Sequence, residues 1–312
     1  MSQALNLVFC GTPRFAVPTL ETLAASFNVH LVVTQPDRPK GRGLELTPSA
    51  VKESALRLKL PITQPDKIKT NDAFRSQLAA LKPDAIIVVG YGRIIPPWML
   101  DLPPLGNINL HASLLPKYRG AAPIQWAIAQ GETVTGVTTM RIDPGLDTGD
   151  ILLQRKFPIA ADDAAETLAP RLAAIGADLM IETLRGLESG AIHPRPQDHA
   201  HATLAPILKK EHGRIDFSWS AQEIFNRIRG FQPWPGVYTK FRNKNLQIWN
   251  ALPVEKILPP AQLQAQGNRL CVGCAHGTSL ELLELQLEGK QRMSASDFLN
   301  GYRPKPNEHL GL

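Results

Sequence analysis

The sequence has only three cysteines in 312 residues, at Cys10, Cys271 and Cys274. An odd number this small excludes a secreted domain that depends on a framework of disulfides. Cys271 and Cys274 form a CxxC pair close to His276, but a structural zinc site needs a second pair of ligands at a matching distance, and the sequence offers none. We therefore expect no metal and interpret the pair as two thiols in a strand.

Long apolar runs are also missing. No run approaches the roughly 18 residues that a membrane-spanning helix needs. The first apolar segment, residues 5–9, is too short for the core of a signal peptide, and Gly11-Thr12-Pro13 follow it closely. We therefore expect a cytoplasmic protein that does not enter a membrane.

The glycine-rich motifs of nucleotide-binding enzymes are absent. A dinucleotide site needs G-x-G-x-x-G at the opening of a helix, so that the pyrophosphate meets backbone amides. After the first expected strand this chain has CGTPRFA, residues 10–16, with one glycine, and no P-loop pattern follows. These absences argue against an NAD or ATP enzyme built on that turn.

The N-terminal part alternates short apolar runs with helical stretches, which predicts an α/β domain with a mainly parallel sheet. The segment 34–49 looks irregular, a helix is expected to begin near Ser49, and a long helix is expected within 162–190. The expected strands are residues 5–10, 29–34, 84–92, 107–112, 135–142 and 151–159.

Prolines and weak periodicity in residues 190–206 predict a linker between a first domain, 1–189, and a second, 207–312. In the second domain, short strands at regular spacing are typical of a small β-barrel. These strands are expected at residues 237–241, 246–251, 269–274 and 279–287.

The positive charge is concentrated in the C-terminal third. Residues 207–312 hold 14 Lys and Arg against nine Asp and Glu, whereas the rest of the chain is nearly neutral. Such an asymmetry favours a polyanionic partner. Two aromatic residues, Trp234 and Tyr238, are interleaved with cations at Lys209, Lys210, Arg214, Arg227, Arg229, Lys240, Arg242 and Lys244.

Candidate catalytic residues lie where strands of the first domain end. Asn109 and His111 are two apart, so on a strand they point to the same face. In an open α/β sheet, ligands bind outside the carboxyl ends of the strands. We expect Gly90–Gly92, the Asn109–His111 segment and the loop 143–150 to meet there.

An amide, an imidazole and a carboxylate suit the transfer of an acyl or formyl group to an amine. Asn109 can donate a hydrogen bond to the developing oxyanion. His111 can donate as well, or exchange a proton near neutral pH, and Asp147 can favour its charged form or relay the proton through water. The alternative is structural: the first two can satisfy loop backbone, and Asp147 can be an ordinary turn residue.

Two long motifs resolve this choice by resemblance. NINLHASLLPKYRGAAPIQWAI and TGVTTMRIDPGLDTGDIL resemble the folate-dependent formyltransferases, and further matches extend over nearly the whole chain. The resemblance implies a Rossmann-like first domain, an OB-like second domain, and catalytic roles for Asn109, His111 and Asp147. It implies a folate site at Ser113, Leu114, Leu115 and Pro116, with the pterin near Gly90, Tyr91 and Gly92.

Within that family, the chain is most similar to enzymes that act on initiator tRNA. The implied reaction moves the formyl group of 10-formyltetrahydrofolate, the co-substrate, to the α-amine of methionyl initiator tRNA. The implied tRNA contacts are a basic loop with Arg38, Lys40 and Arg42, together with Lys209 and Lys210. We expect a monomer.

The basic loop departs from the family pattern, because Leu44-Glu45-Leu46 stand where more lysine is usual. Fewer cations predict fewer phosphate contacts and a shallower salt dependence of tRNA binding. Two alternatives stay open. One is a related folate enzyme that formylates a small amine such as a sugar nucleotide, and the other is a nucleic-acid-binding protein that has lost activity.

Overall fold

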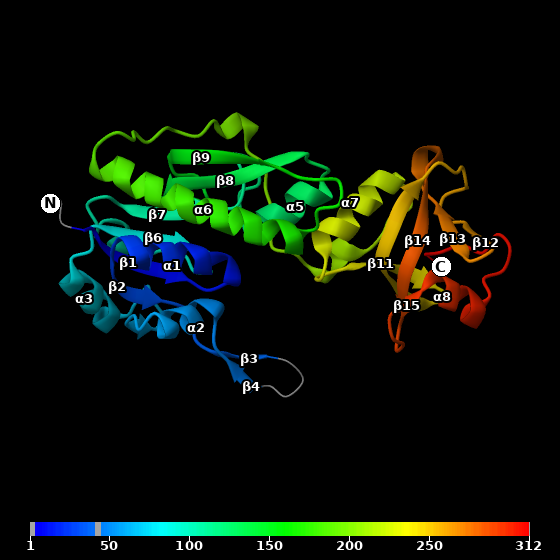
Figure 1. Ribbon diagram of the computed structural model, residues 1–312, viewed down its shortest axis with the longest axis horizontal. Coiled ribbons are helices and arrows are strands. Elements are labelled where there is room, and N and C mark those ends of the chain that lie inside the picture. Colours follow the sequence, from blue (N-terminus) through cyan, green and yellow to red (C-terminus); the bar gives the residue numbers. More distant parts are fainter. Residues whose placement is uncertain (1–3, 41–44, 312) are drawn as a thin grey trace. The chain divides into compact units, whose positions relative to one another are not determined.

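The computed structural model describes residues 4–40 and 45–311 (Figure 1). Within them the chain forms two compact units. The first contains the residues up to 120, with 134–158 and 169–205, and the second contains 121–133, 159–168 and the residues from 206 onward. The domain boundaries at 189 and 206 stay a prediction, because two short inner segments group with the second unit.

The first unit is built on a seven-stranded sheet with the order β5-β2-β1-β6-β7-β8-β9. Strands β5, β2, β1, β6 and β7 pair in parallel, and β8 alone runs in the opposite direction, antiparallel to both β7 and β9. This confirms an α/β domain with a mainly parallel sheet. The strands are β1 Asn6–Gly11, β2 Asn28–Val33, β5 Ile62–Thr63, β6 Ala85–Val89, β7 Asn107–His111, β8 Val134–Arg141 and β9 Ile151–Pro158.

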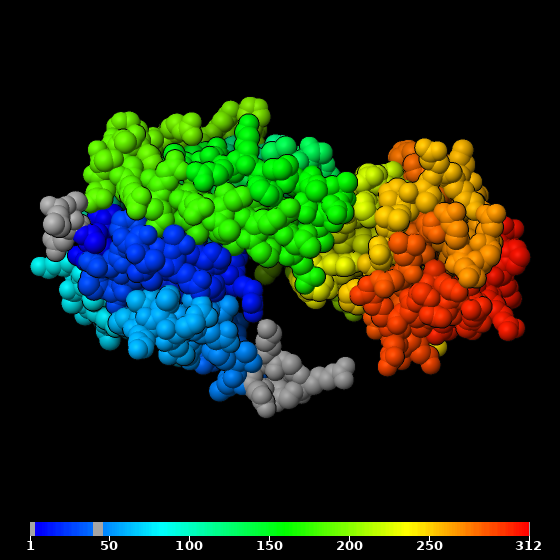
Figure 2. Space-filling model, viewed as in Figure 1, coloured from blue at the N-terminus to red at the C-terminus, as the bar shows by residue number. Residues whose placement is uncertain are grey.

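Helices cover both faces of this sheet. The first-unit helices are α1 Val17–Ser26, α2 Ala50–Arg57, α3 Asp72–Leu81, α4 Pro97–Leu100 and the long α6 Ala165–Glu188, whose first turn groups with the second unit. Ser49 caps α2 by accepting a hydrogen bond from the Lys52 amide, which confirms the expected start of that helix. On the face seen in Figure 2, the surface of α6, in green, meets that of α1, in blue.

The packing of α6 decides which face of β7 is open. A Cβ on Gly176 of α6 would lie 2.6 Å from the Leu110 side chain, so the helix approaches this face very closely. Thr183 of α6 is hydrogen-bonded to Thr139 of β8 on the same face. Because neighbouring residues of a strand alternate in direction, Asn109 and His111 point away from α6.

The segment 34–49 is not irregular throughout. It contains a small hairpin of β3 Arg38–Lys40 and β4 Glu45–Thr47, in which Arg38 is opposite Thr47. Lys52 binds Asp37 at 2.5 Å at the base of the hairpin. The strands have three residues each, too few for a periodic pattern in the sequence.

Residues 190–205 have little regular structure beyond the short 3-10 helix His199–His201, yet they pack with the first unit. Arg195 and Ile151 exchange two backbone hydrogen bonds, and the backbone of Arg119 is hydrogen-bonded to Thr203 and Ala205, on either side of Leu204. The segment is therefore part of the first unit and not a free tether.

The second unit contains an antiparallel sheet with the order β10-β11-β14-β13-β12, and β15 pairs with β14, which confirms a strand-rich second domain. Its strands are β10 Val237–Phe241, β11 Lys244–Val254, β12 Leu263–Gln266, β13 Arg269–Gly273, β14 Ser279–Leu287 and β15 Met293–Ser294. Its helices are α5 Pro123–Ala129, α7 Ala221–Phe231 and α8 Ala295–Tyr302, with short 3-10 turns at Lys210–Gly213 and Ala275–Gly277.

The four strands expected in this unit are present, whereas β12, β15 and α8 carry no clear sequence signal. Across both units, no helix in the described part of the chain is long and apolar enough to cross a membrane.

Candidate active site

The carboxyl ends of β6 and β7 place a glycine beside the candidate histidine. Val88 of β6 is opposite Asn109 of β7 in a parallel pair, so Gly90 follows at the level of His111. Gly90 and Gly92 are exposed and have φ values of +56° and +77°, which strongly favour glycine. The backbone at this edge is therefore open to close approach.

Tyr91 between them does not present its side chain to a ligand. It is 2% exposed and packs among the apolar side chains of the core that includes α3. Its carbonyl accepts hydrogen bonds from Thr12 Oγ1 and Gln35 Nε2. The buried side chain and the bonded carbonyl of Tyr91 therefore help to hold the backbone of this strand end in place.

His111 is buried, with 5% of its surface exposed. Its Nε2 lies 2.9 Å from the carbonyl oxygen of Tyr118. Because a carbonyl only accepts hydrogen bonds, Nε2 carries a proton, and in the neutral ring Nδ1 bears the lone pair. Nδ1 lies 3.6 Å from Oδ2 of Asp147. The proton-exchanging nitrogen of His111 therefore faces a carboxylate.

Asp147 reaches His111 by a route that the sequence did not predict. We expected the loop 143–150 to leave the same sheet edge as β7, but β8 runs antiparallel and its end, Arg141, lies opposite Ile108. That places the start of the loop near the amino end of β7. The loop then folds back toward His111. Asp147 and His111 therefore lie close together as expected, although the loop starts near the other end of β7.

Asn109 is half-buried, and its side chain makes no hydrogen bond to any residue that the structure describes. Asn107, two residues earlier, is 2% exposed and donates to the carbonyls of Met99 and Leu100 at 2.8 and 3.2 Å. The two asparagines therefore differ in kind. Asn107 satisfies backbone carbonyls in the last turn of α4, whereas the amide of Asn109 is available to a ligand.

The SLLP turn after His111 is held by neighbouring strands. The Ser113 hydroxyl donates to the Lys117 carbonyl at 2.6 Å, and the Leu115 amide donates to Thr138 Oγ1 at 3.2 Å. Ser113 and Leu115 are buried, whereas Leu114 and Pro116 are half-buried. Only Leu114 and Pro116 thus retain side-chain surface for a ligand.

Sequence reasoning missed two apolar side chains and a group of polar ones around this site. Ile94, two residues after Gly92, is 88% exposed, and Leu146, next to Asp147, is 61% exposed. A single exposed apolar residue has no signature in a sequence. The polar groups are the Gly120 backbone amide and the Gln197 side chain, which hold Asp147, and the Arg119 guanidinium, which binds Gln197.

The predicted cations of the second unit divide into two groups. Arg227 stacks on Trp219, Arg229 donates to the Asp163 carbonyl, and Arg242 pairs with Glu308. Those three cations stabilise the unit itself. The other cations are exposed and have no such partner in the described part of the chain; they are Lys209, Lys210, Arg214, Lys240 and Lys244.

The two aromatic residues among these cations also differ in exposure. Trp234 is 56% exposed and Tyr238 is half-buried. In the basic hairpin of the first unit, Arg38 is exposed, whereas Arg42 and Leu44 lie outside the described residues.

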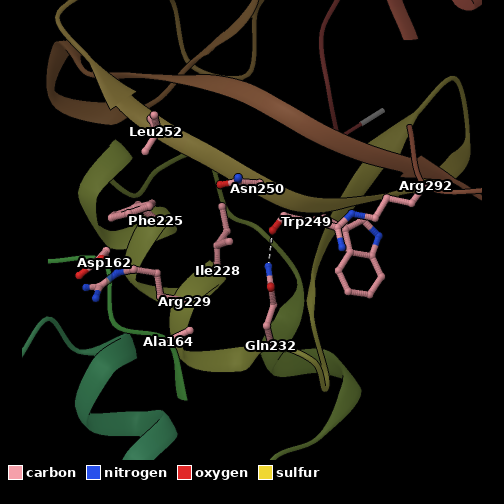
Figure 3. Close-up of a pocket in the computed structure, with 10 residues that line it drawn as sticks. All are labelled: Asp162, Ala164, Phe225, Ile228, Arg229, Gln232, Trp249, Asn250, Leu252 and Arg292. Carbon is pink, nitrogen blue, oxygen red and sulfur yellow. Dashed lines mark hydrogen bonds between the residues drawn. The ribbon is translucent and has the colours of Figure 1, made fainter. Parts of the chain in front are cut away.

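A cavity of about 310 Å³ lies in the second unit (Figure 3) and contains none of the candidate catalytic residues. Its two guanidinium groups are engaged: Arg229 contacts Phe225 and main-chain carbonyls, and Arg292 pairs with Glu284 beside Trp249. Both guanidinium groups therefore already have partners within the unit.

Cys271 and Cys274 are buried and unpaired, with Cys271 on β13 and Cys274 directly after it. Burial raises the pKa of the Cys274 thiol to about 12 and also raises the pKa of Cys271. Both are therefore protonated near neutral pH, and thiols are poor metal ligands.

Comparison with known proteins places this arrangement in a family. Residues 6–184 match the formyl transferase family, and residues 207–303 match the C-terminal domain of formyl transferases. The methionyl-tRNA formyltransferase of Koribacter versatilis is 67% identical over 306 residues, or 98% of each chain. That of Acidobacterium capsulatum is 59% identical over 310 residues, covering 98% of this chain and 100% of its own.

Solved structures show the same fold at low identity. The N-formyltransferase from Helicobacter canadensis, in complex with folinic acid and dTDP-3-aminofucose, has a TM-score of 0.65 at 18% identity and covers 89% of this chain and 98% of its own. HypX from Aquifex aeolicus, in complex with tetrahydrofolic acid, has a TM-score of 0.61 at 19% identity, covering 98% of this chain and 49% of its own. The chain belongs to the formyl transferase family and, within it, to the methionyl-tRNA formyltransferases.

Proposed function

We propose that this protein transfers the formyl group of 10-formyltetrahydrofolate to the α-amino group of methionyl initiator tRNA, which supplies formylmethionyl-tRNA for translation initiation. The observation that carries the proposal is the 67% identity to a methionyl-tRNA formyltransferase over 98% of both chains. The geometry of Asn109, His111 and Asp147 supplies a chemical basis for it.

The reaction exchanges one carbon–nitrogen bond for another. The amine nitrogen of methionine attacks the formyl carbon, and the bond from that carbon to N10 of the folate breaks. One proton leaves the amine and one is delivered to N10, so the step is balanced without a metal or a redox partner. Direct transfer needs no serine or cysteine nucleophile.

Asn109 and His111 have different roles in this proposal. The amide of Asn109, which binds no other residue in the described part of the chain, donates a hydrogen bond to the oxyanion that develops on the formyl oxygen. His111 takes or gives the migrating proton at Nδ1, because Nε2 is bound to the Tyr118 carbonyl. Asp147, 3.6 Å away, stabilises the positive ring that results.

The edge formed by Gly90, Gly92 and the SLLP turn suits the folate. Exposed glycines with open backbone allow a flat heterocycle to hydrogen-bond along its edge. Ile94 and Leu146 offer apolar surface of the kind that a pterin contacts. Proteins of the same fold hold folinic acid and tetrahydrofolic acid.

The basic residues of both units suit tRNA phosphates. Arg38 on the hairpin and Lys209 and Lys210 in the second unit are exposed, and exposed cations bind the phosphate backbone in a salt-dependent way. We assign Arg42 and Lys40 to the same contact. The candidate catalytic groups all come from one chain, so we propose a monomer that acts in the cytoplasm, where initiator tRNA is used.

Offering the protein different amines tests this function. We expect formylmethionyl-tRNA when it is given 10-formyltetrahydrofolate and charged initiator tRNA. Formylation of an amino-sugar nucleotide with the tRNA left unmodified would instead identify a small-amine enzyme. Tight tRNA binding without turnover at any enzyme concentration would identify a binding protein.

A further inference from the structure

Arg119 is a buried cation beside the candidate site. It is 7% exposed, although arginine is rarely buried unless its donors are paired. Its Nε and Nη2 donate to Oε1 of Gln197 at 3.1 and 2.7 Å, and Nη2 also donates to Nδ1 of His199 at 3.1 Å. Neutral acceptors therefore satisfy this charge, and no carboxylate in the described part of the chain pairs with it.

Gln197 joins this cation to the loop of Asp147. It is 5% exposed, and its Nε2 donates to the carbonyls of Asp147 at 2.8 Å and Gly149 at 2.7 Å. An arginine only donates and carbonyls only accept, so the side-chain amide has one possible orientation. Both of its donors and both lone pairs of its oxygen are used.

Asp147 is thereby held at two points. The Gly120 amide donates to its carboxylate oxygen Oδ2 at 2.8 Å, while Gln197 holds its carbonyl. Asp147 has a φ of +51°, in the left-handed region that residues with a side chain uncommonly adopt, although aspartate tolerates it better than most. The contacts with Gly120 and Gln197 therefore hold a backbone conformation that is not the commonest one for this residue.

We propose that Gln197, oriented by Arg119, is a positioning residue that keeps the Asp147 carboxylate facing Nδ1 of His111. Neither Gln197 nor Arg119 needs to touch the substrate. This inference rests on the proposed function, since it concerns formyl transfer at Asp147. Loss of the Gln197 contacts releases the loop 143–150 and lets the carboxylate move.

The test is Gln197→Glu in the full chain. A carboxylate still accepts from Arg119, but it cannot donate to the two carbonyls. We expect turnover to fall about 10- to 100-fold, because a misplacement of about 1 Å costs this much, with little change in the Michaelis constants for folate and tRNA. Arg119→Lys, which keeps the charge and loses the planar fork, should produce a smaller loss of the same kind.

His201→Ala is the matched control. His201 lies on the same segment, is exposed, and pairs with Asp198 without contacting the loop. We expect this variant to keep wild-type turnover. Equal losses in the control and in Gln197→Glu would overturn the proposal, because they would point to the segment as a whole.

Two further measurements separate positioning from a general folding defect. On an Asp147→Asn background, Gln197→Glu should cost no additional turnover, whereas independent effects would multiply and overturn the proposal. Backbone hydrogen exchange of residues 143–150 should become faster in Gln197→Glu and stay unchanged in His201→Ala. Unchanged exchange in Gln197→Glu would also overturn it. The exchange readout needs no activity, so a wild-type protein that fails to formylate tRNA rejects the proposed function separately.

Discussion

Nδ1 of His111 and Oδ2 of Asp147 face each other across 3.6 Å. This is too long for a direct hydrogen bond, and Oδ2 already accepts one from the Gly120 amide. The pair therefore leaves Nδ1 free to exchange a proton beside a carboxylate. The proposed mechanism depends on this relationship.

Substituting His111 should remove the proton-exchanging group. Because His111 is buried, His111→Gln is preferable to His111→Ala, since the glutamine amide can still donate to the Tyr118 carbonyl. We expect turnover to fall about 10²- to 10⁴-fold, while the folate dissociation constant changes little. Both quantities can be measured by rapid-quench formylation and equilibrium titration. Parallel losses in binding and turnover would contradict the assigned role.

Asn109 and Asn107 should respond in opposite ways. Asn109→Ala removes an amide without a hydrogen-bond partner among residues 4–40 and 45–311, and should lower turnover about 10²- to 10³-fold at nearly unchanged thermal stability. Asn107→Ala removes two hydrogen bonds to backbone carbonyls and should lower the free energy of unfolding by about 1–3 kcal/mol. Calorimetry with steady-state kinetics checks both. A stability loss in Asn109→Ala with full turnover would identify it as structural.

Much of the site could be predicted because its signals are local. The two-residue spacing of Asn109 and His111 predicted that both side chains point to one face of a strand. The two residues lie on β7, and α6 covers the opposite face of that strand. A continuous apolar run at 85–89 is typical of a strand buried on both faces, and all five residues of β6 are buried.

The features that could not be predicted depend on long-range contacts. Gln197 lies in a proline-rich segment without periodicity, and its contacts are 48 to 78 residues away in the chain. The antiparallel direction of β8 is likewise set by pairing and not by its alternating pattern, which fits either direction. The strands of the hairpin 38–47 are too short to be distinguished from loop.

The basic hairpin should affect tRNA and not folate. Arg38→Ala and Arg42→Ala should each raise the Michaelis constant for tRNA and lower the slope of log affinity against log salt by about one, if each cation contacts one phosphate. Lys69→Ala, at another exposed cation of the first unit, is the control. Steady-state kinetics at several salt concentrations measure the Michaelis constants for both substrates and the salt slope. A change confined to the folate constant would show that the hairpin serves the other substrate.

Stability at acidic pH should depend on Glu308. Its hydrogen bond to Arg242 lowers the pKa of Glu308 below its ordinary 4.5. A depressed carboxyl pKa stabilises the fold above the unfolded value and loses that contribution as the pH falls through the folded value. Glu308→Gln should therefore be less stable by about 1 kcal/mol at pH 7.

The difference between wild type and Glu308→Gln should shrink between pH 5 and pH 3, a window set by the direction of the shift. Glu255→Gln, at an exposed carboxylate in the same unit, should match wild type throughout. Urea unfolding across this range measures the effect. A constant difference at every pH would mean that the stabilisation does not come from the ionised pair.

The most direct test of the account is the single-turnover formylation rate of Asp147→Asn at saturating 10-formyltetrahydrofolate and methionyl initiator tRNA. The substitution keeps the size of the side chain and the carbonyl that Gln197 holds, but removes the charge that faces His111. We expect a rate at least about 100-fold below wild type, the size of an acid–base contribution, with both substrates bound as tightly as before. A rate equal to that of the wild-type protein would contradict it.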